Sequence, residues 1–155
     1  MERLPQKMLC FLSFTLLCGG SMLLGQSLDQ AKKLYNEGQY AEAKPAFERL
    51  IKQAPSNRSY NLWYGVCCFE TGDLTTAAKH LKVAVKRRTQ EAYRYLGEVY
   101  LLTYKFDEAA EMFEEYISLL TKKKQDTTPF EARLETANEG SRLLDKVEAV
   151  EIIDS

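Results

Sequence analysis

The sequence predicts an all-α fold built from helical hairpins. Apolar residues recur three or four positions apart, as they do on one face of an α-helix; Tyr40, Ala43 and Phe47 are an example. The same arrangement of apolar and small residues returns further along the chain. Gly38 and Gly72 stand where the first helix of a pair would end. These observations together predict pairs of helices that stack on one another.

The repeat becomes visible when the stretches GQYAEAKPAFERLI, GDLTTAAKHLKVAV and YKFDEAAEMFEEYI are aligned. Tyr40, Leu74 and Phe106 share one column, and the steps from 40 to 74 and from 74 to 106 are 34 and 32 residues. The other columns are Ala43, Ala77 and Ala109; Phe47, Leu81 and Phe113; Leu50, Ala84 and Tyr116; and, upstream, Ala31, Gly65 and Gly97. Such spacing is typical of a repeat made of two helices.

Physical reasons support this register. A helical hairpin cannot bury both of its faces alone, so neighbouring hairpins stack to complete a core. Small residues suit the point where the two helices of one hairpin cross, as for Gly65 with Ala77. Glycine at the turn can take a positive φ without steric cost. The third unit has Tyr104 in that place, so we expect its turn to differ or to be strained.

The helices follow in order from these signals. We expect them near 28–37, 40–53, 58–71, 74–87, 90–103 and 106–121. Pro55 ends the second of them, whereas Thr89 and Thr121 stand in the corresponding places of the later units. Residues 122–128 form a polar linker.

A seventh helix, 129–148, is predicted to cap the stack. It would begin at Thr128, with Pro129 in the first turn and Glu131 as the reciprocal acid of a capping box. Its apolar stripe would comprise Phe130, Leu134, Ala137, Leu143, Leu144 and Val147. Residues 149–155, which include Val150, Ile152 and Ile153, look like a strand that begins a following domain; the alternative is a frayed terminus.

The first 25 residues have the layout of a secretory signal. Arg3 and Lys7 precede the apolar run of residues 8–20, and small residues follow near a cleavage site between Gly25 and Gln26 or after Gly20. The alternative is an uncleaved membrane anchor. We therefore expect an exported protein, periplasmic or associated with the outer membrane.

Composition and charge bound the function. Lys and Arg total 21 and Asp and Glu 22, so no overall field attracts nucleic acid. The one histidine, His80, has no nucleophile arrangement around it and is expected on the solvated surface. Neither a Gly-rich phosphate loop nor a metal-ligand spacing is present, and Cys67 and Cys68 are expected to be free thiols. We expect no enzyme activity, no cofactor and no metal.

From about Leu28 to Thr121 the chain resembles the tetratricopeptide repeat family, and the aligned columns carry the resemblance. Three units, about 26–56, 57–89 and 90–121, would follow one another. The family implies a right-handed superhelix whose concave groove, lined by the first helix of each unit, holds a peptide or helix of a partner. By register, the groove residues would be Leu28, Lys32, Tyr35, Asn36, Leu62, Val66, Phe69, Glu70, Arg94, Glu98, Leu101 and Leu102.

The resemblance implies a protein–protein interaction scaffold in the cell envelope, whose partner is a protein or peptide and not a nucleic acid. Membrane contact would come only from the N-terminal segment or from a further domain. The family's clamp for a terminal carboxylate is incomplete, since Lys32 is present but Leu62 and Val66 replace its next members. In the groove, Arg94 would meet an acidic group, with Glu98 orienting it.

Two alternatives remain at this point. The chain would be a structural N-terminal module of a larger envelope protein, with propeller or peptidoglycan-binding domains following and no ligand of its own. Or the seventh helix would lie in the groove and cover Phe69, Leu101 and Leu102.

Overall fold

The computed structural model describes residues 19–153 and the side chains of residues 28–147. Within that range the chain is helical and has no strand, so the predicted all-α fold is confirmed. The helices are α1 (Gly19–Asn36), α2 (Tyr40–Gln53), α3 (Arg58–Glu70), α4 (Leu74–Lys86), α5 (Gln90–Leu102), α6 (Phe106–Lys122) and α7 (Thr128–Ile153). Residues 1–18 of the expected signal lie outside the described range, and α1 begins nine residues earlier than the helix predicted from residue 28.

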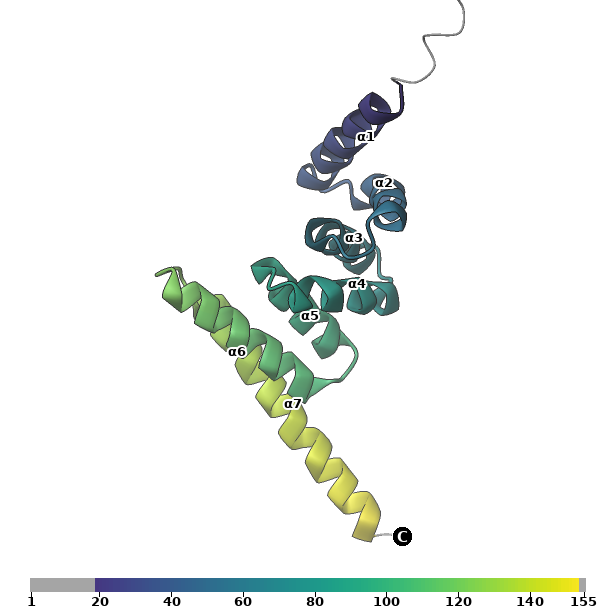
Figure 1. Cartoon of the computed structure of the whole chain (residues 1–155). Helices are drawn as coiled ribbons and strands as arrows, with labels where there is room; N and C mark the ends of the chain where they lie inside the picture. The colour runs from purple at the N-terminus through teal and green to yellow at the C-terminus, as the bar shows by residue number, and fades with distance from the viewer. Residues whose placement is uncertain (1–18, 154–155) are drawn as a thin grey trace, which may run out of the picture.

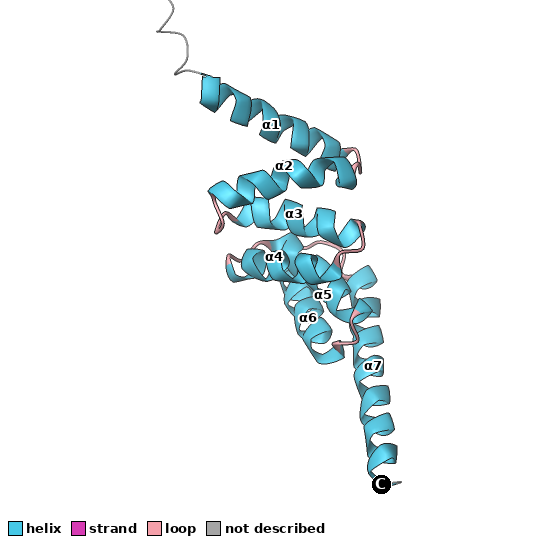
Figure 2. Cartoon of the chain, turned by 90° about the vertical axis from the view of Figure 1, so that its right-hand side faces the viewer, coloured by secondary structure: helices cyan, strands magenta, loops and turns pink. Residues whose placement is uncertain are grey.

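Successive helices pack as antiparallel hairpins, α1 with α2, α3 with α4 and α5 with α6, and each hairpin stacks on the previous one (Figure 1). Figure 2 shows the same stack from the side, with short loops at both of its edges. The aligned columns of the sequence form the core. Ala43, Phe47, Ala77, Leu81, Ala109 and Phe113 are all fully buried.

Small residues are required where the helices of a hairpin cross. A Cβ added to Gly65 would lie 2.8 Å from Leu81 Cγ, and one added to Gly97 would lie 2.9 Å from Phe113 Cζ. Both distances are shorter than van der Waals contact. The glycine column of the sequence therefore marks the crossing points of α3 with α4 and of α5 with α6.

The turns inside the hairpins share one backbone conformation. Gly38 and Gly72 have φ values of 75° and 81°, and Tyr104 takes the equivalent place with a φ of 57°. The third turn therefore keeps the shape of the others and carries the strain of a left-handed side-chain-bearing residue. Arg88 and Lys124, which follow the second helices, share this conformation, with φ values of 55° and 56°.

Side-chain caps fix two of the helix starts. Asn57 Oδ1 accepts hydrogen bonds from the backbone N–H groups of Ser59 and Tyr60 at 3.0 and 3.2 Å, at the start of α3. Asp73 caps α4 by accepting from Thr76 N at 3.1 Å, and this bond lowers the pKa of the Asp73 carboxyl. Lys44 of α2 lies 3.4 Å from the same carboxylate, so it ties the first hairpin to the second.

Helix α7 packs antiparallel along α6 over its first half. The rings of Phe130 and Tyr116 meet edge to face with centroids 4.7 Å apart, Ala137 is fully buried, and Ser141 Oγ donates to Asp107 Oδ1 at 2.6 Å. Asp107 is the second residue of α6. Beyond Ser141, α7 therefore extends past the end of its partner helix, as the yellow segment of Figure 1 shows.

Three expectations for this region need correction. The strand predicted at Val150 is wrong, because α7 continues as a helix to Ile153. The capping pair is shifted by one residue, since Thr127 Oγ1, and not Thr128, donates to Glu131 Oε1, at 2.7 Å. The apolar stripe also splits: Phe130, Leu134 and Ala137 pack against the stack, whereas Leu143, Leu144 and Val147 are exposed.

Candidate partner-binding face

We use the term inner face for the surface formed by the first helices of the hairpins, α1, α3 and α5. The twelve residues predicted from the register all lie on these helices. The four exposed ones are Lys32, Asn36, Glu70 and Leu102. The seven half-buried ones are Leu28, Tyr35, Leu62, Phe69, Arg94, Glu98 and Leu101. The remaining one, Val66, is fully buried. Val66 has no exposed surface, so its prediction as a contact residue is wrong.

Aromatic rings connect the hairpins across the inner face. Phe69 of α3 meets Tyr95 of α5 edge to face, with centroids 5.6 Å apart. Tyr35 of α1 packs against Tyr40 at 5.5 Å, and burial raises the pKa of its phenol above the ordinary value. The aromatic side chains are therefore held in place and half-exposed, which suits them to receive a ligand.

Two residues of this region were missed by register reasoning. Trp63 is half-buried beneath Lys32, whose Nζ lies 5.5 Å from the centroid of the tryptophan ring, and it also contacts Phe47. Tyr95 lies between Phe69 and Arg94. Both residues fall in one repeated column, two positions before Gly65 and Gly97. The signal available was an aromatic residue at the same position of two units, which Asp29 does not continue in the first.

Arg94 is the most unusual group on the inner face. Its Cζ lies 4.2 Å from the centroid of the Tyr95 ring, a stacking distance. Its Nε lies 3.6 Å from Glu91 Oε2, which is close enough for charge attraction but too long for a hydrogen bond. That Nε is buried and has no hydrogen-bond acceptor, although the side chain as a whole is 34% exposed.

The predicted role of Glu98 is wrong. Its Oε1 pairs with Nε of Arg133, on α7, at a distance of 3.0 Å. Arg94 is accompanied instead by Glu91, whose other oxygen accepts a hydrogen bond from the hydroxyl of Tyr116 at 3.1 Å. Glu98 thus fastens α7 to α5 and leaves the Arg94 guanidinium without a second carboxylate.

Helix α7 reaches the predicted groove at Glu98, through Arg133, but the alternative in which it also covers Leu102 is wrong. Leu102, which α7 would cover, is 57% exposed. Phe69 packs edge to face against Tyr95 of α5 and remains half-buried. Figure 1 shows α7 following α6 and leading away from α1 to α4.

His80 belongs to a structural network, so its prediction as a solvated residue is wrong. Asn61 Nδ2 donates to the carbonyls of Pro55 and Asn57, both at 2.8 Å, which leaves Asn61 Oδ1 as an acceptor. His80 Nδ1 lies 2.8 Å from that oxygen and must therefore be the donor. Burial, and then the charge of Lys79, lowers the pKa of His80. The histidine is therefore neutral and holds α4 to α3.

The remaining reactive groups are inert or dispersed. Cys67 and Cys68 are free and fully buried, and burial raises the pKa of the Cys67 thiol to about 12. Within residues 19–153, no three His, Cys, Asp or Glu side chains are placed to hold a metal ion. None of the helices in that same range combines the length and the apolar character needed to cross a membrane.

Comparison with known proteins agrees with this geometry. Residues 28–92 match the model of the tetratricopeptide repeat family. The solved structure of the TPR domain of Sgt2 from Aspergillus fumigatus is similar, with a TM-score of 0.65 and 17% sequence identity, over 80% of this chain and 82% of that one. At this identity the likeness concerns the fold alone. No match is found among curated proteins.

The family match and the stacked hairpins define the class: a superhelical repeat protein of the kind that serves in protein–protein interaction. Residues 28–92 of this chain match the tetratricopeptide repeat family, and residues 19–153 have the fold of a tetratricopeptide repeat domain.

Proposed function

We propose that the protein binds a peptide or helix of a partner protein on the inner face, with an acidic group of the ligand against Arg94. The general role of the family in protein–protein interaction supports the class of partner. The side chains of α1, α3 and α5 support the location of the proposed site on the inner face.

The observation that carries the proposal is the buried Nε of Arg94, which has no hydrogen-bond acceptor and only the more distant Glu91 carboxylate at 3.6 Å. A buried donor without an acceptor costs free energy, and the cost is larger for a charged group. A carboxylate of a ligand can accept two parallel hydrogen bonds from a guanidinium. Because Tyr95 holds the guanidinium plane in place, little side-chain entropy is lost when such a ligand binds.

Apolar anchors lie beside this charged group. Tyr35, Leu62 and Phe69 are half-buried on α1 and α3, and Trp63 lies next to Leu62 in the chain. Packed helices are separated by about 10 Å, so a ligand that crosses the stack meets one anchor on each first helix. Aromatic and arginine side chains carry most of the binding energy in many interfaces. The expected ligand is therefore an apolar segment that carries an acidic residue.

Selection of peptides from a displayed random library against the full chain would test this proposal. Peptides bound on the inner face should lose about 1–4 kcal/mol of binding free energy in Arg94→Ala, because truncation removes the stacked guanidinium. Arg49→Ala is the matched control. It removes the same charge from an exposed residue of α2, the second helix of the first hairpin. Equal affinity of the selected peptides for wild type and Arg94→Ala, with the fold intact, would contradict the proposal.

We further propose that this binding takes place outside the cytoplasm, in the cell envelope. The proposal depends on the basic start and the apolar run of residues 1–25. N-terminal sequencing of the protein isolated from its native source tests it. A start near Gln26 or Ser27 would support export with cleavage, whereas Met1 on a protein recovered from the cytoplasm would contradict it.

A further inference from the structure

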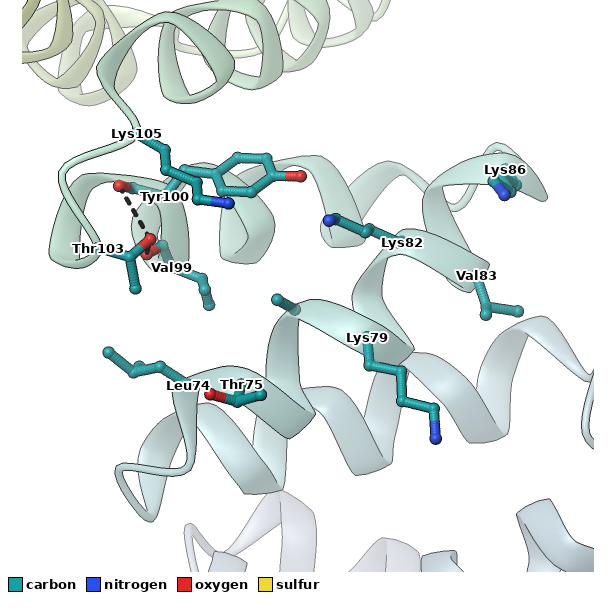
Figure 3. A pocket seen from close by; sticks show the side chains of 11 residues that line it. Leu74, Thr75, Lys79, Lys82, Val83, Lys86, Val99, Tyr100, Thr103 and Lys105 are labelled. Carbon is teal, nitrogen blue, oxygen red and sulfur yellow. Dashed lines mark hydrogen bonds between the residues drawn. The ribbon is translucent and has the colours of Figure 1, made fainter.

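A second recess lies on a different side of the stack. A cavity of about 600 Å³ opens between α4 and the C-terminal end of α5 (Figure 3). We call it the outer cavity. Four lysines surround it: Lys79, Lys82 and Lys86 of α4, and Lys105, which precedes α6.

The positive charge of the outer cavity is not neutralised by the protein. None of its eleven lining residues is acidic. All four lysines are exposed, and among the ion pairs of the described side chains none involves any of them. Like charges gathered in a recess raise the local concentration of anions.

Tyr100 forms the centre of the charged cluster. The residue is 8% exposed, and the ammonium groups of Lys82 and Lys105 lie 5.6 and 6.0 Å from the centroid of its ring. Figure 3 shows Lys105 beside this ring and Lys82 directed toward it. The tyrosine thus holds two of the lysines at the mouth of the cavity.

Apolar side chains also line the outer cavity, between the lysines. Leu74 and Val83 are half-buried on α4, and Val99 of α5 is buried. A ligand that fits must therefore combine negative charge with at least one apolar side chain. Inorganic anions supply only the first of these.

The outer cavity is distinct from the inner face. Residues of an α-helix are about 100° apart around its axis, so Val99 and Thr103 lie on the side of α5 opposite Arg94. The two surfaces do not share a residue.

We propose that the outer cavity binds an acidic peptide segment of a partner protein. Its carboxylates would lie against the four lysines, and one apolar side chain would lie against Leu74 and Val83. Lys79 and Lys86 are separated by about 10 Å along α4, which three or four residues of an extended peptide can span. A nucleic acid fits less well, because the formal net charge of the chain is −1 and the positive charge is local.

Fluorescence anisotropy of a labelled peptide, EEFEEL, with the full chain tests the proposal. The expected result is saturable binding that weakens as salt rises from 50 to 300 mM, because exposed charge pairs are screened. The peptide QQFQQL, which keeps the apolar residues and lacks the charge, should not bind. Binding of both peptides with equal affinity would overturn the proposal.

Two triple variants locate the site. Lys79→Gln, Lys82→Gln, Lys105→Gln should weaken binding of EEFEEL about tenfold, since each exposed ion pair is worth a factor of about 1.5 to 5. The control Lys122→Gln, Lys123→Gln, Lys124→Gln removes the same charge from an exposed run at the end of α6 and should leave the affinity unchanged. Equal loss in both triple variants would show a non-specific charge effect and would overturn the proposal.

Two further experiments distinguish an acidic peptide in the outer cavity from binding on the inner face and from other classes of ligand. EEFEEL carries the apolar and acidic groups that the inner face would also take, so the anisotropy is repeated with Arg94→Ala. Binding that the first triple variant weakens should persist in Arg94→Ala, and its loss there would place the peptide on the inner face and overturn the proposal. A 20-nucleotide oligothymidine, or vesicles of phosphatidylglycerol, should bind without sensitivity to the first triple variant. Lysine-dependent binding of either probe, with no binding of EEFEEL, would overturn the acidic peptide in favour of that class of ligand.

Discussion

Arg94 stacks on the ring of Tyr95, with its Cζ 4.2 Å from the ring centroid, while its buried Nε has no acceptor within hydrogen-bond distance. The two residues are neighbours in α5, and Phe69 of the preceding hairpin packs against the same tyrosine. A contact between hairpins therefore fixes the position of a cation on the inner face. The ring of Tyr95 therefore takes part both in the stacking of the second hairpin on the third and in the candidate binding site.

The close crossing of α5 and α6 predicts the effect of one methyl group. Gly97→Ala should lower the free energy of unfolding by about 1–3 kcal/mol, because the new Cβ would lie 2.9 to 3.1 Å from three atoms of the Phe113 ring. Urea denaturation followed by circular dichroism measures the change. Glu111→Ala, at an exposed position of α6, is the control and should change stability by less than about 0.5 kcal/mol. Equal stability of Gly97→Ala and wild type would refute the assigned register.

The shared turn conformation predicts opposite effects of a matched pair of substitutions. Gly72→Ala should destabilise by about 1 kcal/mol, although nothing lies within 4 Å of the new Cβ, because φ is 81° there. Arg88→Gly should stabilise by up to about 1 kcal/mol, because it relieves a φ of 55° at an exposed residue. Thermal unfolding of the two variants beside wild type tests both signs. A loss of stability in Arg88→Gly would show that the arginine side chain makes a contribution larger than the strain.

The partly buried contact between His80 and Asn61 predicts a dependence of stability on pH. The pKa of His80 is lowered from 6.5 in the folded state, so below pH 6.5 the unfolded chain binds a proton that the folded chain resists. The contribution of the neutral histidine to the free energy of unfolding is complete above pH 6.5. It declines as the pH falls toward the pKa of His80 in the folded state. Wild type should therefore lose more stability than His80→Gln between pH 8 and 5.5. Parallel curves for the two proteins would contradict a lowered pKa of His80 in the folded state.

The division of α7 predicts different results for two truncations. Removing residues 142–155 should change the free energy of unfolding by less than about 1 kcal/mol, since Leu143, Leu144 and Val147 are exposed. Removing residues 128–155 should cost about 3 kcal/mol or more, because it uncovers the partners of Phe130, Leu134 and Ala137. Guanidinium denaturation of both truncated chains gives the comparison. A large loss of stability on removal of residues 142–155 alone would mean that the projecting half of α7 packs on the fold.

Much of this fold could be predicted from the sequence, because local signals and repeat signals agree. The positions of α2 to α6 follow from the apolar period and from Gly38 and Gly72, and the structure differs from the prediction by one residue at most at each end. The C-terminal end was harder. Val150, Ile152 and Ile153 have side chains that favour strands, but α7 continues through them. Residue propensity is a weak guide when a long helix already precedes.

The candidate site could be predicted only in part, because its chemistry depends on contacts between distant residues. Register placed Arg94 and Glu98 on one face correctly but paired them with each other. Glu98 in fact pairs with Arg133, which belongs to a helix outside the repeats. The contact of His80 with Asn61 likewise joins two helices, and neither residue type signals it.

The most direct test of the central claim is to locate a bound peptide by solution NMR. A peptide selected from the displayed library would be titrated into the isotope-labelled full chain, and the shifts of backbone amides and of the arginine Nε–H groups followed. Binding on the inner face predicts the largest shifts at Phe69, Tyr95 and the Nε–H of Arg94, with little change along α4. Shifts confined to α4 or α7, with the Arg94 resonance unmoved at saturation, would contradict the inner face as the partner-binding site.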